Sequence, residues 1–214
     1  MSSQDNCHNY NDRIKSDPNV LQSGESWLNI LIEANRIYDL KHLLENYANP
    51  DIKNIHGTTP LHKAAHCRSE KIVDILLRFG ACPNSVDNKY NTPLHISVET
   101  HNRKIAEMLL RKGAKPNKVN EYGESVLHLS VKQELVKMTQ LFLNFRANTN
   151  LQDIDGNTPL HFCVKENMSS RDRNIARALR NAGAKIDISN KENITVLDLL
   201  KKYNISQYHI DPRE

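Results

Sequence analysis

A four-residue motif returns along this chain at a constant spacing, and that regularity constrains the fold more than any other feature. Successive copies begin 33 residues apart: Thr59-Pro60-Leu61-His62, Thr92-Pro93-Leu94-His95, Ser125-Val126-Leu127-His128 and Thr158-Pro159-Leu160-His161. Weaker copies begin at Ser26, 33 residues before the first, and at Thr195, 37 residues after the last. Self-similarity at a period of about 20 to 50 residues is the signature of repeat architectures such as solenoids.

Residues outside the motif keep the same spacing. All seven glycines fall on two positions of the repeat, Gly24, Gly57, Gly123 and Gly156 on one, and Gly80, Gly113 and Gly183 on the other. Asp or Asn recurs on two further positions: Asp51, Asn84, Asn117, Asn150 and Asp187, and then Asn54, Asp87, Asn120, Asp153 and Asn190. Because these positions agree with the motif, the stretch is predicted to be one array of repeats.

These residues resemble the ankyrin-repeat family, whose unit is a pair of short antiparallel helices followed by a projecting β-hairpin-like loop. The resemblance covers roughly residues 21–205 and implies an all-α solenoid of helix-turn-helix units, with about six repeats including degenerate caps. The expected repeats are 21–53, 54–86, 87–119, 120–152, 153–189 and a partial one at 190–205. Residues 1–20, rich in Ser, Asn and Asp, are expected to be disordered, and residues 206–214 to form a C-terminal tail.

Each copy of the motif is suited to begin a helix. A Thr or Ser side chain accepts a hydrogen bond from a free amide of the first turn, and proline is tolerated at the next position. After Thr59-Pro60, apolar residues follow at helical spacing on two segments: Leu61, Ala64 and Ala65, and then Ile72, Val73, Leu76 and Leu77. One unit cannot cover this apolar surface alone, so the core is expected to be shared between neighbouring repeats.

The chain departs from the family pattern at several turns. Where the family usually has glycine between the two helices, this chain has other residues: Asn35, Arg68, His101 and Glu134. Tyr90 likewise replaces a loop glycine. A left-handed backbone at such a residue costs on the order of 1 kcal/mol. The four extra residues of the fifth repeat fall in the polar stretch 166–173, where we expect an enlarged loop between the helices.

Composition and cysteine usage bound the class of protein. With 38% hydrophobic and 25% charged residues, the 214-residue chain has ordinary globular composition and the length of one domain. No apolar run approaches the roughly 18 residues of a membrane span, and residues 1–10 lack an apolar signal core. The cysteines form no CxxC pair and are expected to be reduced thiols: Cys7, Cys67, Cys82 and Cys163. We therefore expect a soluble, non-secreted protein of the cytoplasm, the nucleus or both.

The recurring histidine raises the question of catalysis or metal binding, for which imidazole is the usual candidate. In ankyrin repeats, the histidine that His62, His95, His128 and His161 match commonly orders the loop and the neighbouring repeat through hydrogen bonds. For zinc, His66 and Cys67 are adjacent rather than at ligand spacing, and Cys163 matches the core position of Ala64. The resemblance therefore implies a structural role for the repeated histidine.

Other residues give no better catalytic centre. The acidic residues Glu25, Glu33, Asp153 and Asp155 are expected at solvent-facing positions, without an apolar pocket that would shift their pKa values. The sequence contains no phosphate-binding GxxxxGK[ST], no nucleophile elbow GxSxG and no HExxH. We therefore predict that the chain is not an enzyme and has no catalytic residue, cofactor or metal.

A repeat array adds one loop and one inner helix on the same side with every unit, which implies a long concave binding surface. The family's contact positions, carried onto this sequence, give the candidate protein-binding residues Ile55, His56, His66, Lys89, Tyr90, Glu99, Glu121, Tyr122, Lys132, Ile154, Asp155 and Lys165. Tyr90 and Tyr122 are the best anchors, because tyrosine buries much area at low entropic cost, and Ile55 and Ile154 come next. The alternative is that these side chains only shape their loops.

Charge alone selects no partner, because the net charge of +4 comes from Lys and Arg residues spread among 25 acidic ones. The densest positive cluster is Arg171, Arg173, Arg177 and Arg180, which fits either a solvated outer helix or an acidic partner. Aromatic residues do not interleave with it, which argues against single-stranded nucleic acid. We expect a protein partner, no small-molecule substrate, no membrane contact and a chain that is monomeric by itself.

The predicted function is a non-enzymatic protein–protein interaction module that acts as an adaptor or inhibitor. A narrower alternative, drawn from repeat number, is an inhibitor of the NF-κB type, including viral versions, that sequesters a Rel-type transcription factor. The chain has no DSGxxS phosphodegron, so such an inhibitor would lack signal-dependent degradation. A proteasome-assembly chaperone and a ubiquitin-ligase adaptor are weaker alternatives, the second because residues 201–214 are too short for a ligase-recruiting box.

Overall fold

The structure is a computed structural model that describes residue 19, residues 21–22 and residues 24–210. Of the segment 1–20 that the sequence predicts to be disordered, only Asn19 is described, where its side-chain oxygen accepts a hydrogen bond from the Asn49 amide at 2.7 Å. The prediction of disorder at residues 1–18 and 20 and the prediction of a tail at residues 211–214 fall on residues outside the described ones.

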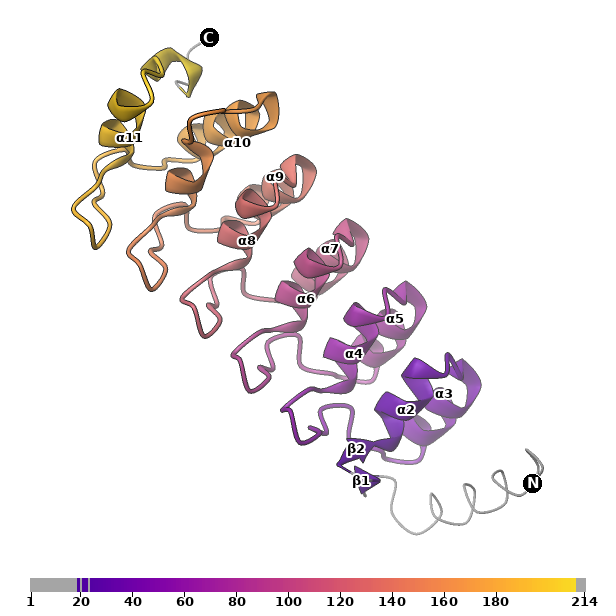
Figure 1. Ribbon diagram of the computed structural model, residues 1–214. Coiled ribbons are helices and arrows are strands. Elements are labelled where there is room, and N and C mark those ends of the chain that lie inside the picture. Colours follow the sequence, from indigo (N-terminus) through magenta and orange to yellow (C-terminus); the bar gives the residue numbers. More distant parts are fainter. Residues whose placement is uncertain (1–18, 20, 23, 211–214) are drawn as a thin grey trace.

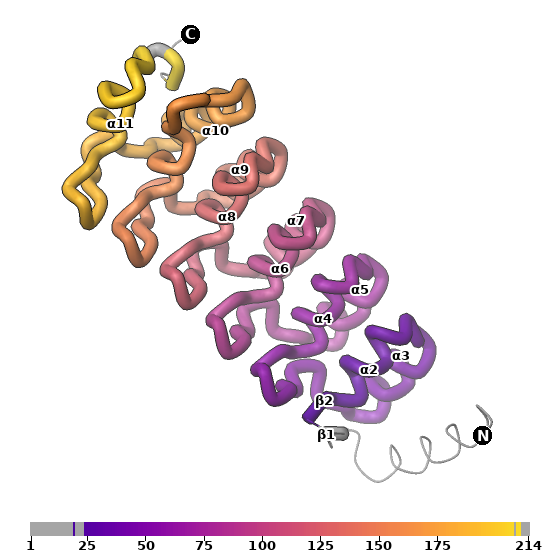
Figure 2. The backbone as a smooth tube through the Cα atoms, viewed as in Figure 1, coloured from indigo at the N-terminus to yellow at the C-terminus, as the bar shows by residue number. Residues whose placement is uncertain are grey.

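Pairs of helices stack side by side in chain order, and the loops between successive pairs project from one edge of the row (Figures 1 and 2). The first helices of the pairs are α2 (Trp27–Glu33), α4 (Pro60–His66), α6 (Pro93–Glu99), α8 (Val126–Lys132), η1 (Pro159–Cys163, a 3-10 helix) and α11 (Val196–Lys202). The second helices are α3 (Ile37–Glu45), α5 (Glu70–Arg78), α7 (Arg103–Arg111), α9 (Val136–Asn144) and α10 (Ser170–Asn181). This arrangement confirms the all-α solenoid predicted from the repeat.

Strand structure is minor in the part of the chain that the structure describes. Strands β1 (Leu21–Gln22) and β2 (Glu25–Ser26) pair antiparallel before α2, with Leu21 opposite Ser26 and Gln22 opposite Glu25. Isolated bridges join Val119 to Ser125 and Ser189 to Thr195 at the bases of two later loops. The projecting loops are therefore hairpin-like without forming a sheet.

The repeated histidine ties each helix start to the next repeat. The Thr92 amide donates to His95 Nδ1 at 3.1 Å, which closes a capping box at the start of α6. Because an amide can only donate, Nδ1 is the unprotonated nitrogen, and Nε2 donates to the carbonyl of Glu124 in the next loop at 3.2 Å. His62, His128 and His161 make the same pair of contacts. The structural role predicted for this histidine is confirmed.

The hydrophobic core runs along the whole row. Equivalent leucines of successive first helices, Leu61, Leu94, Leu127 and Leu160, have no exposed surface, and the second helices contribute buried residues such as Ile72, Ile105 and Phe142. Cys163 is fully buried at the position that matches Ala64, as predicted. Each helix pair thus buries its apolar face against its neighbours, which is the usual source of stability in a solenoid.

Non-glycine residues take the left-handed backbone conformation at the predicted turns. The φ angles are 52° at Asn35, 56° at Arg68, 54° at His101 and 53° at Glu134, and Tyr90 has a φ of 60°. At the loop position of Tyr90 the next loop is close: a Cβ on Gly123 would lie 2.8 Å from the Ile154 amide nitrogen. The repeat geometry therefore imposes these conformations on whichever residue occupies the position.

The fifth repeat differs from the prediction of a loop over 166–173. Its first helix is the five-residue η1, and Val164 is already extended, with a φ of −98° and a ψ of 102°. However, α10 begins at Ser170, so residues 170–173 are helical and the loop ends at Ser169. The Ser169 side chain accepts from the Asp172 amide at 3.1 Å, and Asp172 accepts from the Ser169 amide at 2.8 Å. The loop between the two helices, residues 164–169, is therefore enlarged as expected, to six residues against three at 67–69, and the capping box lengthens the second helix as well.

Packing continues beyond the predicted end of the repeat domain at residue 205. After α11, a short 3-10 helix η2 (Gln207–His209) leads to Ile210, which has no exposed surface and joins the core. Within the expected tail 206–214, Ile210 therefore packs against the solenoid, whereas Ser206, Gln207 and His209 are exposed.

Candidate protein-binding surface

An Asp or Asn side chain organises each projecting loop. Asn54 Oδ1 accepts from the amides of His56 at 3.0 Å and Thr58 at 2.9 Å, while the Asn54 amide donates to the Thr58 carbonyl at 3.1 Å. Equivalent bonds recur in the later loops at Asp87, Asn120, Asp153 and Asn190. This explains the Asp/Asn spacing seen in the sequence, because such side chains fix a turn by accepting from amides two and four residues on.

Main-chain hydrogen bonds also join each loop to the next one. The Asn88 amide donates to the His56 carbonyl at 3.1 Å, the Glu121 amide to the Lys89 carbonyl at 2.9 Å, and the Ile154 amide to the Tyr122 carbonyl at 3.0 Å. The series extends to both ends of the array through Ile55 and Lys191. The loops therefore form a continuous, ordered edge.

Large apolar side chains are exposed along this edge. Ile55 is 65% exposed, Tyr90 61%, Tyr122 52% and Ile154 50%, on successive loops. We call these four residues the loop row. Each is at least half exposed although its backbone is hydrogen-bonded in place, which leaves apolar area on this edge.

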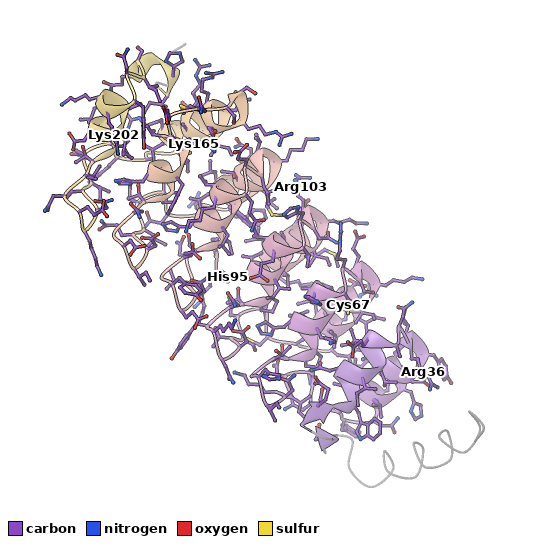
Figure 3. The ribbon with its side chains drawn as sticks, in the orientation of Figure 1. Arg36, Cys67, His95, Arg103, Lys165 and Lys202 are labelled. Atoms are coloured by element: carbon purple, nitrogen blue, oxygen red, sulfur yellow. The ribbon has the colours of Figure 1, made fainter. Side chains whose placement is uncertain are left out.

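All twelve residues proposed from the sequence are exposed, on the loops or at the ends of the first helices. His66, Glu99 and Lys132 lie at or near the last turns of α4, α6 and α8, and Lys165 follows η1. Figure 3 shows Lys165 and Lys202 at the C-terminal end of the row. The structure thus brings the twelve residues to one surface, formed by the loops and the first helices, which we call the inner surface.

Two of the proposed lysines already have partners within the chain. Lys132 Nζ lies 2.5 Å from Glu124 Oε1 and 4.3 Å from the centre of the Phe162 ring. Lys165 Nζ lies 2.8 Å from Glu134 and 3.1 Å from the buried Asp172, and its hydrogen bond with Glu134 raises the pKa of Lys165. Spacing arguments missed these contacts because the partners belong to different repeats or loops.

The acidic residues expected to face solvent differ in their surroundings. Asp153 is buried because its carboxylate holds the loop amides, and only Asp155 and Glu33 are exposed as expected. Glu25 is partly buried, which raises its pKa, but hydrogen bonds from Asn54 at 2.9 Å and Asn29 at 2.6 Å outweigh this and lower the pKa overall. The expectation was therefore wrong for Asp153 and Glu25.

Comparison with known proteins identifies the family. The family described as ankyrin repeats (3 copies) matches residues 28–120 and 112–190. The chain belongs to the ankyrin-repeat family. A curated ankyrin repeat protein of Rickettsia felis is 38% identical over 76 residues, 34% of this chain, and the chain spans about a quarter of that protein's length, 25%.

Two solved ankyrin-repeat structures share the fold. The ankyrin repeat domain of Bcl-3, described as a unique member of the IκB protein family, has a TM-score of 0.81 and 23% identity, with 95% of this chain and 89% of that one covered. An ankyrin repeat domain from Acinetobacter baumannii AYE has a TM-score of 0.79 and 24% identity, with 86% and 93% covered. At these identities the likeness concerns the fold, and ankyrin repeats indicate a protein-interaction module.

Two hollows open on the inner surface of the ankyrin array. One, of about 250 Å³, lies near the N-terminal end and has polar walls that include Glu25, His56 and His66. The other, of about 380 Å³, lies between η1 and α11, with Phe162, Val164, Ile194 and Leu199 among its walls and Lys202 at its edge. Because η1 ends two residues earlier than α4, α6 and α8 do, the end of α11 lacks neighbouring helix there.

The ankyrin histidines are poorly placed for proton transfer. Burial lowers the pKa of His95 to about 4, and burial also lowers the pKa of His62, His128 and His161. Both ring nitrogens of each are engaged in the hydrogen bonds described above. Among the described residues, no three His, Cys, Asp or Glu side chains are grouped as metal ligands, and no helix has the length and apolar character of a membrane span.

Proposed function

We propose that this ankyrin-repeat chain binds one protein partner on its inner surface and acts as a non-enzymatic adaptor or inhibitor in the cytoplasm or nucleus. The loop row carries the proposal. Four large apolar side chains stand at least half exposed on loops whose backbones are already fixed by hydrogen bonds. A preordered surface loses little conformational entropy on binding, so more of the contact energy contributes to affinity.

Tyr90 and Tyr122 are the anchors we propose, and a double substitution tests them. Tyr90→Ala/Tyr122→Ala is expected to weaken partner binding at least about tenfold, since anchor residues at interfaces commonly contribute more than about 1 kcal/mol each. The partner is captured from cell lysate with the wild-type chain, and its dissociation constant is then measured by calorimetry for each variant.

The chain offers a matched control for this experiment. Tyr38, on α3, is 82% exposed, and Tyr47, just beyond that helix, is 93% exposed, both on the side of the second helices. Tyr38→Ala/Tyr47→Ala also removes two tyrosine side chains, but away from the loops, and is expected to change the affinity less than about twofold. Equal losses in both double variants, with helicity unchanged by circular dichroism, would remove the loop row from the binding site.

The likeness to the Bcl-3 domain favours one narrower candidate, an inhibitor that holds a Rel-type transcription factor. The support is the match over 95% of this chain and 89% of the Bcl-3 domain. A purified Rel-homology region, with and without its nuclear-localisation segment, provides the test. We expect tighter binding when that segment is present, whereas no binding to either form would leave the chain an adaptor or inhibitor of another protein. Capture of a proteasome subunit or a ubiquitin ligase would favour those two alternatives instead.

A further inference from the structure

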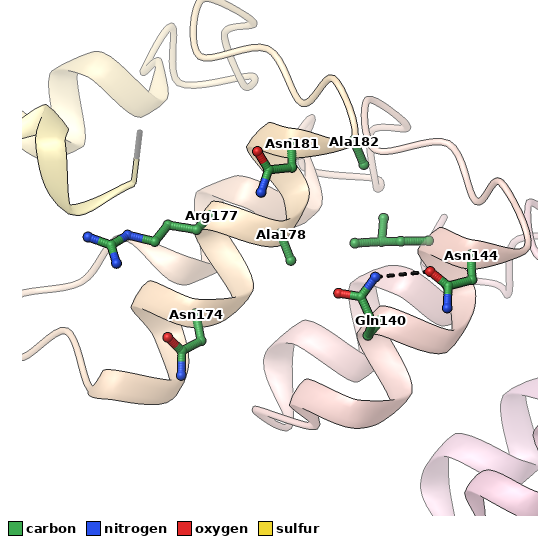
Figure 4. A pocket seen from close by; sticks show the side chains of 8 residues that line it. Gln140, Asn144, Asn174, Arg177, Ala178, Asn181 and Ala182 are labelled. Carbon is green, nitrogen blue, oxygen red and sulfur yellow. Dashed lines mark hydrogen bonds between the residues drawn. The ribbon is translucent and has the colours of Figure 1, made fainter. Parts of the chain in front are cut away.

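The outer side of the array carries a second surface that is distinct from the inner one. Figure 1 places the second helices, α9 and α10 among them, on the side away from the loops. Between α9 and α10 lies a groove of about 390 Å³, drawn in Figure 4. We call it the outer groove. Its walls include Gln140, Leu143 and Asn144 from α9, and Asn174, Arg177 and Asn181 from α10.

Carboxamide side chains dominate the outer groove. Gln140 Nε2 donates to Asn144 Oδ1 at 3.0 Å, the bond dashed in Figure 4. That bond orients both groups and leaves Gln140 Oε1 as an acceptor and Asn144 Nδ2 as a donor. Asn174 and Asn181 add two more carboxamides on the opposite wall. A carboxamide both donates and accepts, which matches the amide and carbonyl of an extended peptide backbone.

The two helices that form the outer groove carry more unpaired positive charge than the earlier outer helices. Each of those helices pairs a cation with an acidic residue of its own, Lys41 with Glu45, Arg78 with Asp74, and Arg111 with Glu107. On α9 and α10 the single acidic residue is the buried Asp172, which pairs with Lys165. The cations on these two helices, which have no ion pair among the described residues, are Lys137, Arg171, Arg173, Arg177 and Arg180.

Arg177 adds a separate indication. Its Nε is buried and has no hydrogen-bond partner among the described residues. Figure 4 shows the side chain extending from α10 away from Gln140 and Asn144, at the margin of the outer groove. Arg177 is also the cation among the residues that line the outer groove, so a carboxylate bound at this margin would meet positive charge.

We propose that the outer groove binds an extended acidic segment of a protein, independently of the inner surface. The peptide main chain lies against the carboxamides of Gln140, Asn144, Asn174 and Asn181, and its acidic side chains reach the arginines of α10. The outer groove favours a peptide over a single-stranded nucleic acid, because none of the described residues that line it is an aromatic on which a base could stack. The arginines select acidic residues.

Fluorescence polarisation with the full chain and a labelled peptide of alternating glutamate and alanine tests the proposal. Arg171→Glu/Arg177→Glu is expected to weaken binding of this probe at least about tenfold. The control, Arg103→Glu/Lys112→Glu, reverses the same number of charges at α7, where Arg103 and Lys112 are exposed, and is expected to cost less than about twofold. Equal losses in the two double variants would overturn the proposal, because attraction would then depend on net charge alone.

A second probe tests recognition of the main chain. The same peptide with N-methylated amides is expected to bind the wild-type chain several-fold more weakly than the unmethylated peptide does. The variant Asn144→Leu/Asn181→Leu is expected to bind the two peptides equally, and both weakly. Equal binding of the two probes by the wild-type chain would overturn the proposal, as would displacement of the probe by a single-stranded oligonucleotide at a lower concentration than by unlabelled peptide. Tyr90→Ala/Tyr122→Ala should bind the probe normally, so this result is separable from that of the inner surface.

Discussion

At the scale of single residues, the repeated histidine combines capping, connection between repeats and a pH dependence. Each imidazole accepts from an amide at its own helix start and donates to a carbonyl of the next repeat, which requires the neutral ring. Burial opposes protonation, so the pKa of His95 falls to about 4 from an ordinary value of 6.5. The unfolded chain therefore binds protons more readily than the folded one between these two values.

Stability is predicted to fall as the pH drops below about 6.5. A histidine whose pKa is lowered on folding contributes stability that is complete above its unfolded pKa and is lost as the pH falls towards its folded pKa. His95 alone is expected to cost about 2 kcal/mol of unfolding free energy between pH 7.5 and pH 5.0. Urea unfolding at the two pH values, followed by circular dichroism, measures this. His95→Gln should show a smaller difference, and an identical difference would contradict this assignment.

The sequence predicts residue conformations well where the repeat dictates them. The left-handed φ angles at Arg68, His101 and Glu134 follow from position alone, because each stands where the family has glycine. Residue environment is harder to predict. Asp153 was expected in solvent from its position in the repeat, but its carboxylate is buried by the loop amides that it binds. Register shows which positions are equivalent, whereas burial depends on the contacts of the next repeat.

At the scale of elements, the fifth repeat shows how extra residues are accommodated. The polar stretch after residue 165 was predicted as loop because it lacks an apolar period, yet half of it is helical. The signal was the capping pair Ser169 and Asp172, three residues apart, which marks a helix start whatever the hydrophobic pattern. Capping therefore predicts the boundary better than periodicity does here.

The Ser169 cap is expected to stabilise α10 measurably. Ser169→Ala removes the acceptor of the Asp172 amide and should cost about 1 kcal/mol of unfolding free energy. Ser170→Ala, at the next and exposed position, should change stability by less than about 0.5 kcal/mol. Urea unfolding of the two variants provides the comparison, and hydrogen exchange should quicken in the first turn of α10 only for Ser169→Ala. Equal effects would mean that α10 is held by packing alone.

At the scale of the whole molecule, cohesion comes from contacts between neighbouring repeats, so stability is expected to vary along the row. The middle repeats are covered on both sides by full repeats, whereas α11 adjoins the shortened η1, with a hollow of about 380 Å³ between them. The repeat period predicted this architecture from the sequence. It did not predict the hollow, because the early end of η1 depends on local backbone geometry.

Native-state hydrogen exchange is expected to follow this gradient. Amides of α6 and α8 should exchange through global unfolding. Amides of α11 should exchange through a local opening whose free energy is lower than that of global unfolding by about 2 kcal/mol or more. Mass spectrometry with peptide resolution measures both. Uniform protection from α4 to α11 would show that the array unfolds as one cooperative unit despite the hollow.

Because the repeats share one backbone geometry, a partner could in principle bind at several positions that differ by one repeat. The side chains of the loop row distinguish these positions. Ile55 and Ile154 occupy the same position of their loops, but Tyr90 stands where Gly57 and Gly123 do, and Tyr122 where His56 and Lys89 do. If these side chains are the anchors proposed above, moving a bound partner along by one loop places each of them against the wrong site. The loops therefore share one backbone geometry but differ in their exposed side chains. A partner that contacts two adjacent loops through those side chains would fit the array in a single position.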